Sequence, residues 1–410
     1  MKQKSLFIIF LIVFIDLLGF SLILPLLPFY AESFGATPIQ IGLLVASYAA
    51  AQFIGAPILG RFSDRFGRRP VLMISIFGSF IGFLLLGFAG TLWVLFTARL
   101  LDGFTGGNIS VAQAYITDIT NEKNRARGLG LIGAAFGLGF IIGPAIGGVL
   151  SEFGYAVPAL FAAGFSILAF LGATVFLQES LDPETRLTLS KKNSDEFRLK
   201  NYLNNLSRPR VGPLLNIRFF YSLAFSTFQT IFPLYALYHL ELSARNTGFV
   251  LTYVGVLVVF VQGFLVSKIS NRFRDNRIIF TSLFILMFSL FAWAFVPSVA
   301  ALLIILIPLA FSTGTLNTVL NSALSKSVTP EEVGGTLGIS ASLESLTRVI
   351  SPSTGGWLLG SLGTWAPGVF SGIIMIFTVG YAYRRLISQT EIHPQTSQEL
   401  IQETVRNSSE

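Results

Sequence analysis

Five ionisable side chains lie within long apolar stretches of this chain: Asp16, Arg99, Asp102, Glu344 and Arg348. A charge near the centre of a bilayer costs about 2.5 to 3.5 kcal/mol on insertion scales, so such a residue is expected to have a partner or a task. The acids can take up and release protons, and a nearby arginine can bias that exchange. The chemistry indicated is therefore proton transfer rather than bond making.

The spacing of these residues pairs four of them along their own helices. Arg99 and Asp102 are three positions apart, and Glu344 and Arg348 are four apart, so each pair shares a helix face. For Glu344 and Arg348, mutual neutralisation and a functional role both stay open. Asp16 has no basic neighbour in its own helix and must find one across the bundle or be protonated by its surroundings. We predict that Asp16 is the proton site and that Arg99 swings between Asp16 and Asp102.

The elements that position these residues are membrane-spanning helices. The composition is 52% hydrophobic and 12% charged, which would leave a soluble globule of 410 residues short of polar surface. Apolar stretches recur at about the 20-residue length that a helix needs to cross a hydrocarbon core. We predict an all-α membrane protein with twelve transmembrane helices. They are expected at 5–30, 39–60, 70–90, 92–117, 128–151, 155–178, 213–240, 246–269, 277–296, 299–325, 334–360 and 364–385.

Basic residues gather in alternate loops between these stretches. The first set is Lys2, Lys4, Arg61, Arg65, Arg68, Arg69, Lys123, Arg125, Arg127, Arg186, Lys191, Lys192, Arg198, Lys200, Arg208, Arg210, Lys268, Arg272, Arg274, Arg277, Arg384 and Arg385. The opposite loops offer only Arg245. By the positive-inside rule both termini are cytoplasmic, which requires an even number of spans. Nucleic-acid binding is not expected, because it needs basic residues clustered on one soluble face.

Several other site types have no support in the composition. The chain has no cysteine, which removes disulfides, thiolate catalysis and most zinc sites. His239 and His393 lie at a helix end and in a polar tail, so no metal or cofactor is expected. The first apolar run follows Lys2 and Lys4 but is long, carries Asp16 and lacks a small-x-small cleavage site, so we expect it to remain as the first helix.

Two halves of the chain repeat each other. Residues 121–130 align without gaps with 329–338, and the same register pairs 144–148 with 352–356. Six plus six parallel repeats are typical of one large class of secondary transporters. The expected units are an N-terminal six-helix bundle at 1–178, a cytoplasmic linker at 179–212, a C-terminal six-helix bundle at 213–385 and a disordered cytoplasmic tail at 386–410.

The loop GRFSDRFGRRP from Gly60 to Pro70 fits the pattern G-x-x-x-D-R-x-G-R-R at every defined position. Those positions are Gly60, Asp64, Arg65, Gly67, Arg68 and Arg69. Two glycines permit a tight turn, an aspartate can sit against the positive N-terminus of a helix, and arginines can stay among the headgroups. This loop resembles the signature loop of the major facilitator superfamily. A decayed copy, Ser270-Asn271-Arg272-Phe273, occurs in the second half.

Two further motifs extend the resemblance. Arg99 to Gly107 on the fourth helix resembles R-x-x-x-G-x-x-G, which is found across that superfamily. The fifth helix is similar to G-x-x-x-G-P-x-x-G-G of the drug:proton antiporter branch, through Gly139, Gly143, Pro144, Gly147 and Gly148. Small residues at this spacing also allow close helix packing, and the two interpretations are compatible. Overall the chain resembles tetracycline efflux proteins, although the acidic residues that they carry in helices three and nine have no counterpart here.

The resemblance implies a gate on the cytoplasmic side. Asp64 is expected to face the N-terminus of the eleventh helix near Gly334 and Gly335, and Arg68 is expected to reach Asp118. Together these contacts would hold the cytoplasmic side closed when the carrier opens outward.

Uncharged polar and aromatic residues are the candidates for a substrate cavity. They are Gln52, Asn108, Gln113, Tyr115, Phe228, Gln229, Asn317 and Asn321. Each could equally bond to a neighbouring helix. Few fixed charges beside many phenylalanines favour an amphiphilic or weakly cationic organic substrate over a phosphate or a sugar.

These features predict a proton-coupled exporter of small amphiphilic compounds that works by alternating access as a monomer. We expect it in a bacterial inner membrane, with protons, the bilayer and a small-molecule substrate as partners. The alternative is an uptake facilitator, or a carrier of an endogenous metabolite or lipid-like cargo, without drug efflux. An enzyme would need clustered ligands or a nucleophile with its base, and no such set is evident.

Overall fold

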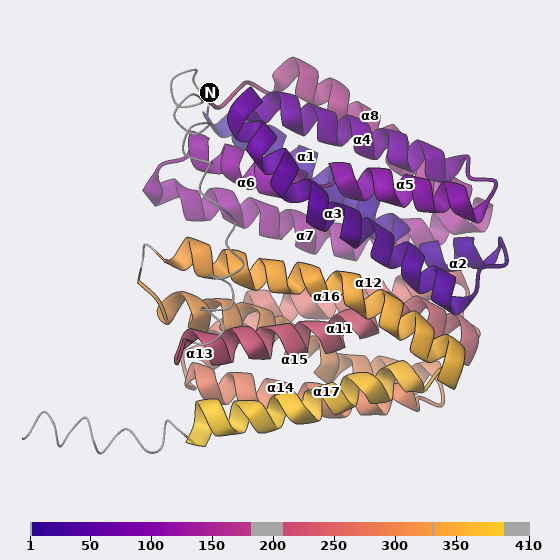
Figure 1. The fold of residues 1–410 in the computed structure, drawn as a ribbon, viewed down its shortest axis with the longest axis vertical. Coiled ribbons are helices and arrows are strands. Elements are labelled where there is room, and N and C mark those ends of the chain that lie inside the picture. Colours follow the sequence, from indigo (N-terminus) through magenta and orange to yellow (C-terminus); the bar gives the residue numbers. More distant parts are fainter. Residues whose placement is uncertain (1, 182–207, 330–331, 389–410) are drawn as a thin grey trace, which may run out of the picture.

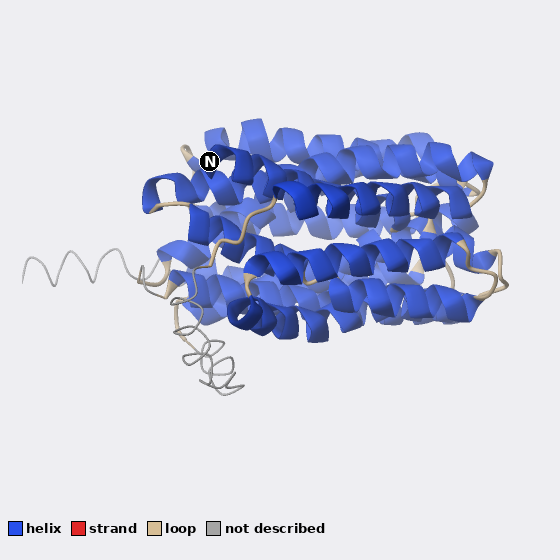
Figure 2. Ribbon diagram, turned by 90° about the horizontal axis from the view of Figure 1, so that it is seen from above, coloured by secondary structure: helices blue, strands red, loops and turns tan. Residues whose placement is uncertain are grey.

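The computed structural model describes residues 2–181, 208–329 and 332–388. Within these ranges the chain consists of helices joined by short connections, and no strand occurs there (Figures 1 and 2). Helices satisfy their backbone hydrogen bonds locally, as a chain in hydrocarbon must. Nine helices in the described part are long and apolar enough by themselves to cross a membrane.

The first half supplies six membrane segments. Its helices are α1 (Lys2–Ile23), α2 (Leu27–Glu32), α3 (Pro38–Phe66), α4 (Arg68–Gly87), α5 (Leu92–Thr105), α6 (Asn108–Ile119), α7 (Glu122–Leu150), the short η1 (Ser151–Phe153) and α8 (Ala156–Phe176). Helices α1 and α2 together make the first predicted span, and α5 and α6 make the fourth. The chain breaks before Pro25, which disfavours helix at the residue ahead of it, and at Gly106 and Gly107.

The second half supplies six more. Its helices are α11 (Val211–Leu240), α12 (Ala244–Phe260), the π-helical η2 (Val261–Leu265), α13 (Val266–Ser270), α14 (Asp275–Ala294), α15 (Val299–Lys326), α16 (Val333–Leu362), α17 (Ala366–Ala382) and the π-helical η3 (Tyr383–Ile387). Figure 1 shows the helices of the two halves as two adjacent groups. The prediction of twelve transmembrane segments in two six-helix bundles is confirmed.

Three segments are not among the nine apolar helices: the α5–α6 segment, α11 and α16. The first carries Arg99 and Asp102, the second carries Arg218, and the third carries Glu344 and Arg348. Helix α16 packs along α3 and α11, and α5 packs along α3 and α4. These polar segments therefore depend on protein neighbours to cross the membrane.

The two halves meet through α3 on α16 and α7 on α12. A Cβ added at Gly42 of α3 would lie 2.3 Å from the Pro352 carbonyl oxygen, and one added at Gly248 of α12 would lie 2.3 Å from that of Pro144. Glycine at both positions allows backbone to touch backbone. Because 144–148 and 352–356 are the repeated segments, the sequence duplication corresponds to a pair of equivalent contacts between the halves.

These contacts lie at one end of the molecule. We call the end that carries the α3–α4 and α13–α14 loops, with Arg61, Arg65, Arg272 and Arg274, the basic face, and the other end the opposite face. At the opposite face Arg245 Nη1 donates to Glu152 Oε1 across the halves at 2.7 Å. Toward the basic face, nothing lies within 4 Å of a Cβ added at any of several glycines of α7 and α16. These are Gly130, Gly133, Gly334, Gly335 and Gly338. The structure is therefore closed at the opposite face and open toward the basic face.

Three predicted boundaries differ from those of the structure. Leu181 is buried, and Glu179 bonds to the start of α4, so the first half extends beyond residue 178. The second half begins with α11 at Val211 and continues past 385, because Leu386 is buried and its carbonyl accepts from Asn276 Nδ2 at 3.0 Å. The rest of the predicted linker (182–207) and of the predicted tail (389–410) lies outside the described residues.

Candidate functional site

The first half holds a polar cluster at the centre of its helices. Arg99 Nη1 donates to Asp102 Oδ2 at 3.0 Å, and both side chains are almost fully buried. The Arg99 guanidinium also lies 4.2 Å from the centre of the Tyr48 ring on α3. Asp16 of α1 accepts a hydrogen bond from Ser79 Oγ of α4 at 3.3 Å.

Asp16 differs from Asp102 in its partners and its exposure. Arg99 is paired with Asp102, and Asp16 forms no ion pair with any residue that the structure describes. Its further polar neighbours are Asp102 and Asn108. Asp16 is also only half-buried, whereas Asp102 is 3% exposed. The structure thus brings Asp16, Arg99 and Asp102 together, and Asp16 is the less buried of the two acids and the one that has no ion-paired cation among the described residues.

The second half holds a matching cluster with the opposite excess of charge. Glu344 Oε2 accepts from Arg218 Nη2 at 2.5 Å, and Glu344 Oε1 accepts from Arg348 Nη2 at 2.8 Å. Arg218 also donates to Asn317 Oδ1 at 3.0 Å. One carboxylate therefore serves two guanidinium groups, one on α11 and one on its own helix α16.

Arg218 was not among the residues predicted to belong to a site. It is the sixth residue of the predicted span 213–240, so a basic residue within an apolar stretch was the available signal. Glu344 and Arg348 do form an ion pair, but Glu344 is shared with Arg218, so neutralisation within the pair is incomplete and a functional role stays a prediction. The Arg218 side chain is 6% exposed and that of Arg348 is 47% exposed. Arg218 is the buried member of the cluster, and Arg348 is the open one.

This geometry predicts unequal stability effects for two neighbouring substitutions. Glu344→Gln leaves the buried Arg218 without a carboxylate, so it should lower the free energy of unfolding by about 3 to 5 kcal/mol. Arg348→Gln breaks only a half-exposed ion pair, so it should cost about 1 kcal/mol or less. Thermal unfolding of both variants in the same detergent measures the difference. Equal melting temperatures would contradict the inference that the buried Arg218 needs the Glu344 carboxylate for stability.

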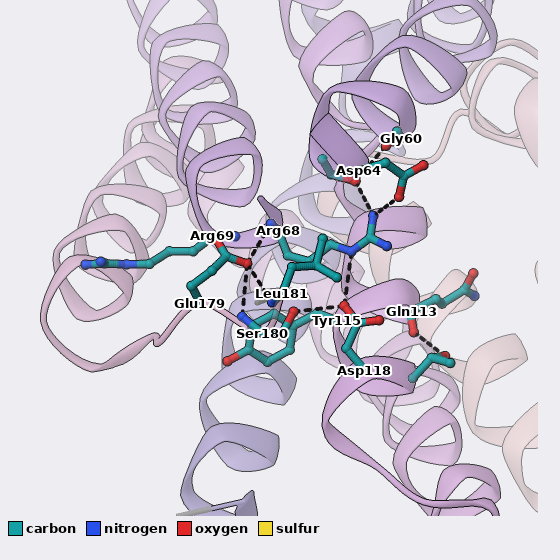
Figure 3. A network of polar contacts seen from close by, with 12 residues as sticks. Gly60, Asp64, Arg68, Arg69, Gln113, Tyr115, Asp118, Glu179, Ser180 and Leu181 are labelled. Carbon is teal, nitrogen blue, oxygen red and sulfur yellow. Dashed lines mark hydrogen bonds and ion pairs between the residues drawn. The ribbon is translucent and has the colours of Figure 1, made fainter. Parts of the chain in front are cut away.

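The loop between α3 and α4 forms a second candidate site at the basic face (Figure 3). Arg68 Nη1 contacts Asp64 and donates to Ser63 Oγ at 2.6 Å, and Arg68 Nε donates to Asp118 Oδ2 at 3.1 Å. Gly67 has a φ of 108°, a conformation that residues with side chains rarely adopt. The loop thus turns sharply at Gly67 and holds Arg68 between two carboxylates.

Glu179 is a member of this network that the sequence analysis assigned to the linker. Its Oε1 accepts from the Arg68 backbone N–H at 2.9 Å, and its Oε2 accepts from that of Arg69 at 3.2 Å. Helix α4 starts after Gly67, which has no side chain to cap it, so Glu179 supplies the cap and the negative charge that a helix N-terminus favours. An acidic residue just after an apolar stretch was the only sequence signal.

Other predicted loop features have different outcomes. Gly60 lies within α3, with nothing within 4 Å of an added Cβ, so its assignment to a tight turn was wrong. Arg65 is exposed and lies 5.3 Å from the Phe66 ring centre. The contact between Arg68 and Asp118 is present within the first half. Nothing described lies within 4 Å of a Cβ added at Gly334 or Gly335, so the expected contact of Asp64 with these glycines of α16 is not made in this structure and stays a prediction.

The predicted antiporter motif on α7 packs against two neighbours. A Cβ added at Gly143 would lie 2.0 Å from Ser21 Oγ of α1, and one at Gly147 would lie 2.5 Å from the Leu22 carbonyl oxygen. Ser21 Oγ donates to the Gly139 carbonyl at 2.7 Å. Pro144 and Gly148 face α12 of the other half. The motif therefore serves close packing at the place where the halves meet.

The predicted substrate cavity needs the largest revision. Phe228 is 1% exposed and packs on Trp293 inside the second half, and Tyr115 is 1% exposed and donates to the Gln178 carbonyl at 2.8 Å. Neither of them lines a cavity, so both assignments were wrong. Both are large apolar rings that fill the core of their own half.

The polar cavity candidates divide by exposure. Asn108 is fully buried, Gln52 donates to the Gly106 carbonyl at 2.9 Å, and Asn317 holds Arg218. Gln229 is half-buried, while Gln113 and Asn321 are exposed.

Helix α16 adds an exposed row of small residues that ends in an arginine. The row is Gly334, Gly338, Ala341 and Arg348. Small and charged residues on one face suit water better than lipid.

Comparison with known proteins gives a consistent result. The family model described as Major Facilitator Superfamily matches residues 9–352 and 214–407. Tetracycline resistance protein, class H, of Pasteurella multocida is 34% identical over 85% of this chain and 88% of its own length. Multidrug resistance protein 2 of Bacillus subtilis is 28% identical over 92% of this chain and 94% of its own length.

A solved structure agrees on the fold. The crystal structure of the human organic anion transporter MFSD10 superposes with a TM-score of 0.67 at 22% identity, covering 93% of this chain and 99% of that one. Two repeated bundles, the α3–α4 loop network and the family match lead to one conclusion. The chain is a multi-pass membrane transporter and belongs to the Major Facilitator Superfamily.

Proposed function

We propose that this chain exports small amphiphilic organic compounds in exchange for protons. The observation that carries the proposal is Asp16, a half-buried acid that lies beside the buried pair of Arg99 and Asp102 and forms no ion pair within the described part of the chain. An acid in that position can bind a proton and pass it on. Relatives named for tetracycline resistance and multidrug resistance support export as the direction.

Proton and substrate move as the two halves rock about their contacts. By the positive-inside rule the basic face is cytoplasmic, so the open structure faces inward and both termini lie in the cytoplasm of a bacterial cell. Asp16 takes up a proton from outside and releases it inside, while Arg99 alternates between Asp102 and Asp16. When the basic face closes, the N-terminus of α16 approaches Asp64 and the helix dipole favours that contact.

An efflux assay tests this proposal directly. A chemically diverse panel of fluorescent compounds is loaded into bacteria that lack their main exporters, with and without this chain. Efflux of at least one compound should depend on the chain and stop when an uncoupler removes the proton gradient. Chain-dependent movement that an uncoupler leaves unchanged would instead support the facilitator alternative.

A second candidate, a carrier of organic anions, is favoured by the charges of the second half. Arg218 and Arg348 share Glu344, so one positive charge is left over. Arg348 is half-exposed at the end of the exposed row on α16. A substrate carboxylate or sulfonate would neutralise that positive charge and match the planar geometry of the guanidinium.

Matched pairs of ligands separate this candidate from the first. N-dansylphenylalanine and its carboxamide differ only in the anionic group, and dansyl fluorescence reports binding to the purified chain in nanodiscs. An anion carrier should bind the acid about tenfold more tightly than the amide. Arg348→Gln should remove the preference and Arg348→Lys should retain part of it. Equal affinities for acid and amide across three such pairs would exclude this candidate.

A further inference from the structure

A groove opens on the outer surface of the first half, between α4 and α8. It has a volume of about 470 Å³ and lies near the basic face. Its lining residues are Arg69, Pro70, Met73, Ile74, Phe77 and Phe170. The contacts between the halves come mainly from α3 on α16 and α7 on α12, with smaller contributions from α2, α11 and η1, and not from α4 or α8. The groove therefore faces the surrounding membrane, apart from the central clusters, and it shares only Arg69 with the α3–α4 loop network.

The body of the groove suits a hydrocarbon chain. Phe77 of α4 and Phe170 of α8 form its aromatic wall, with ring centres 5.3 Å apart. Ile74 is 60% exposed and Phe77 is 44% exposed, so apolar surface is available along the groove. Apart from Arg69, every lining residue is apolar. A chain of methylene groups would fill this space with dispersion contacts.

Arg69 stands at the end of the groove nearest the basic face. Its Nη2 donates to the Thr174 carbonyl oxygen at 2.7 Å, one of the last carbonyls of α8, which lack partners in their own helix. Its Nε is buried without a hydrogen-bond partner, and the side chain forms no ion pair with any described residue. The neighbouring Arg68, in contrast, contacts two carboxylates.

The two arginines also point in different directions (Figure 3). Arg68 points into the network around Asp118, whereas Arg69 extends away from that network. The bond to α8 fixes the Arg69 guanidinium but leaves its charge unbalanced. A guanidinium at the edge of the bilayer favours a phosphate, whose oxygens match its N–H groups. A single ligand with a phosphate and an acyl chain would meet both ends of the groove.

We propose that this groove binds one anionic phospholipid of the leaflet at the basic face. The headgroup phosphate pairs with Arg69, and an acyl chain lies along Met73, Ile74 and Phe77 against Phe170. Because Glu179 holds the backbone of Arg68 and Arg69 together, the bound lipid also tethers the α3–α4 loop to the end of α8. The lipid is thus a ligand of the loop network.

Native mass spectrometry of the delipidated chain tests the proposal. The chain is titrated with phosphatidylglycerol and with phosphatidylcholine that carries the same acyl chains. For the first lipid bound per chain, the wild type should have an affinity for phosphatidylglycerol about tenfold higher than for phosphatidylcholine. Arg69→Gln should abolish that preference. Arg61→Gln, which removes an exposed arginine near the end of α3 and outside the groove, should leave it intact.

Two further measurements separate headgroup and chain. Glycerol 3-phosphate, the soluble headgroup alone, should not compete with phosphatidylglycerol. Ile74→Trp should weaken the binding of both lipids, because the indole fills the groove. Equal affinity for the two lipids would overturn the proposal. An equal loss of preference in Arg61→Gln and Arg69→Gln would also overturn it, since it would mean that the whole basic face attracts anions.

Discussion

Replacement of Asp16 with Asn should lower proton-driven transport about 100-fold, to the level of empty vesicles. Asn keeps the size of the side chain and can still bond to Ser79, but it cannot carry a proton. Transport is measured in proteoliposomes with an imposed pH gradient. Downhill exchange of labelled for unlabelled substrate needs no proton, so the Asp16→Asn variant should retain it. The combined result would assign proton coupling, and not substrate binding, to Asp16.

Asp275→Asn is the matched control for this experiment. Asp275 pairs with Lys326 Nζ at 2.8 Å on the surface of the second half, far from the central clusters in the fold. The same carboxylate-to-amide change there should leave gradient-driven transport within twofold of the wild type, because exposed ion pairs contribute about 1 kcal/mol or less. Asp16→Asn carriers that still accumulate substrate against the pH gradient would refute the assignment.

Gly248→Leu should prevent the carrier from closing at the opposite face, which is the state described here, and should therefore stop transport. Even a Cβ at this position would lie 2.3 Å from the Pro144 carbonyl oxygen, so a leucine side chain cannot fit between α12 and α7. Overpacking costs about 1 to 3 kcal/mol, which shifts a two-state equilibrium about 5- to 150-fold. The opposite face should therefore stay open and the basic face closed. Gly42→Leu, at the equivalent contact with Pro352, should act in the same way.

Thiol labelling measures that shift, because the natural chain has no cysteine. Ala341→Cys places a single reporter on the exposed face of α16, where a soluble maleimide reaches it through the open basic face. Labelling should slow at least about fivefold when Gly248→Leu is added. Gly164→Leu, where nothing lies within 4 Å of an added Cβ, should leave the rate unchanged. Unchanged labelling in Gly248→Leu would show that this contact does not control opening.

The twelve membrane segments, their arrangement as two halves and the family could all be predicted from the order of the residues. These features are local or repeated: an apolar stretch forms a helix because its backbone bonds close within the stretch, and Gly67 marks its turn because few other residues adopt that conformation. The motif from Gly60 to Arg69 and the paired segments 144–148 and 352–356 could be recognised from order alone.

The partners of individual side chains, and the face toward which the carrier opens, depend on how distant helices pack. Glu344 and Arg218 are 126 positions apart, and Glu179 and Arg68 are 111 apart, so no periodicity links them. Phe228 and Tyr115 fit a cavity by residue type, but helix rotation turns them into the core of their own half. Opening toward the basic face depends on how the two halves pack against each other, and one sequence must be compatible with both the open and the closed arrangement. Hydropathy fixes helices within the bilayer, whereas contacts between helices fix their rotation, their partners and their motion.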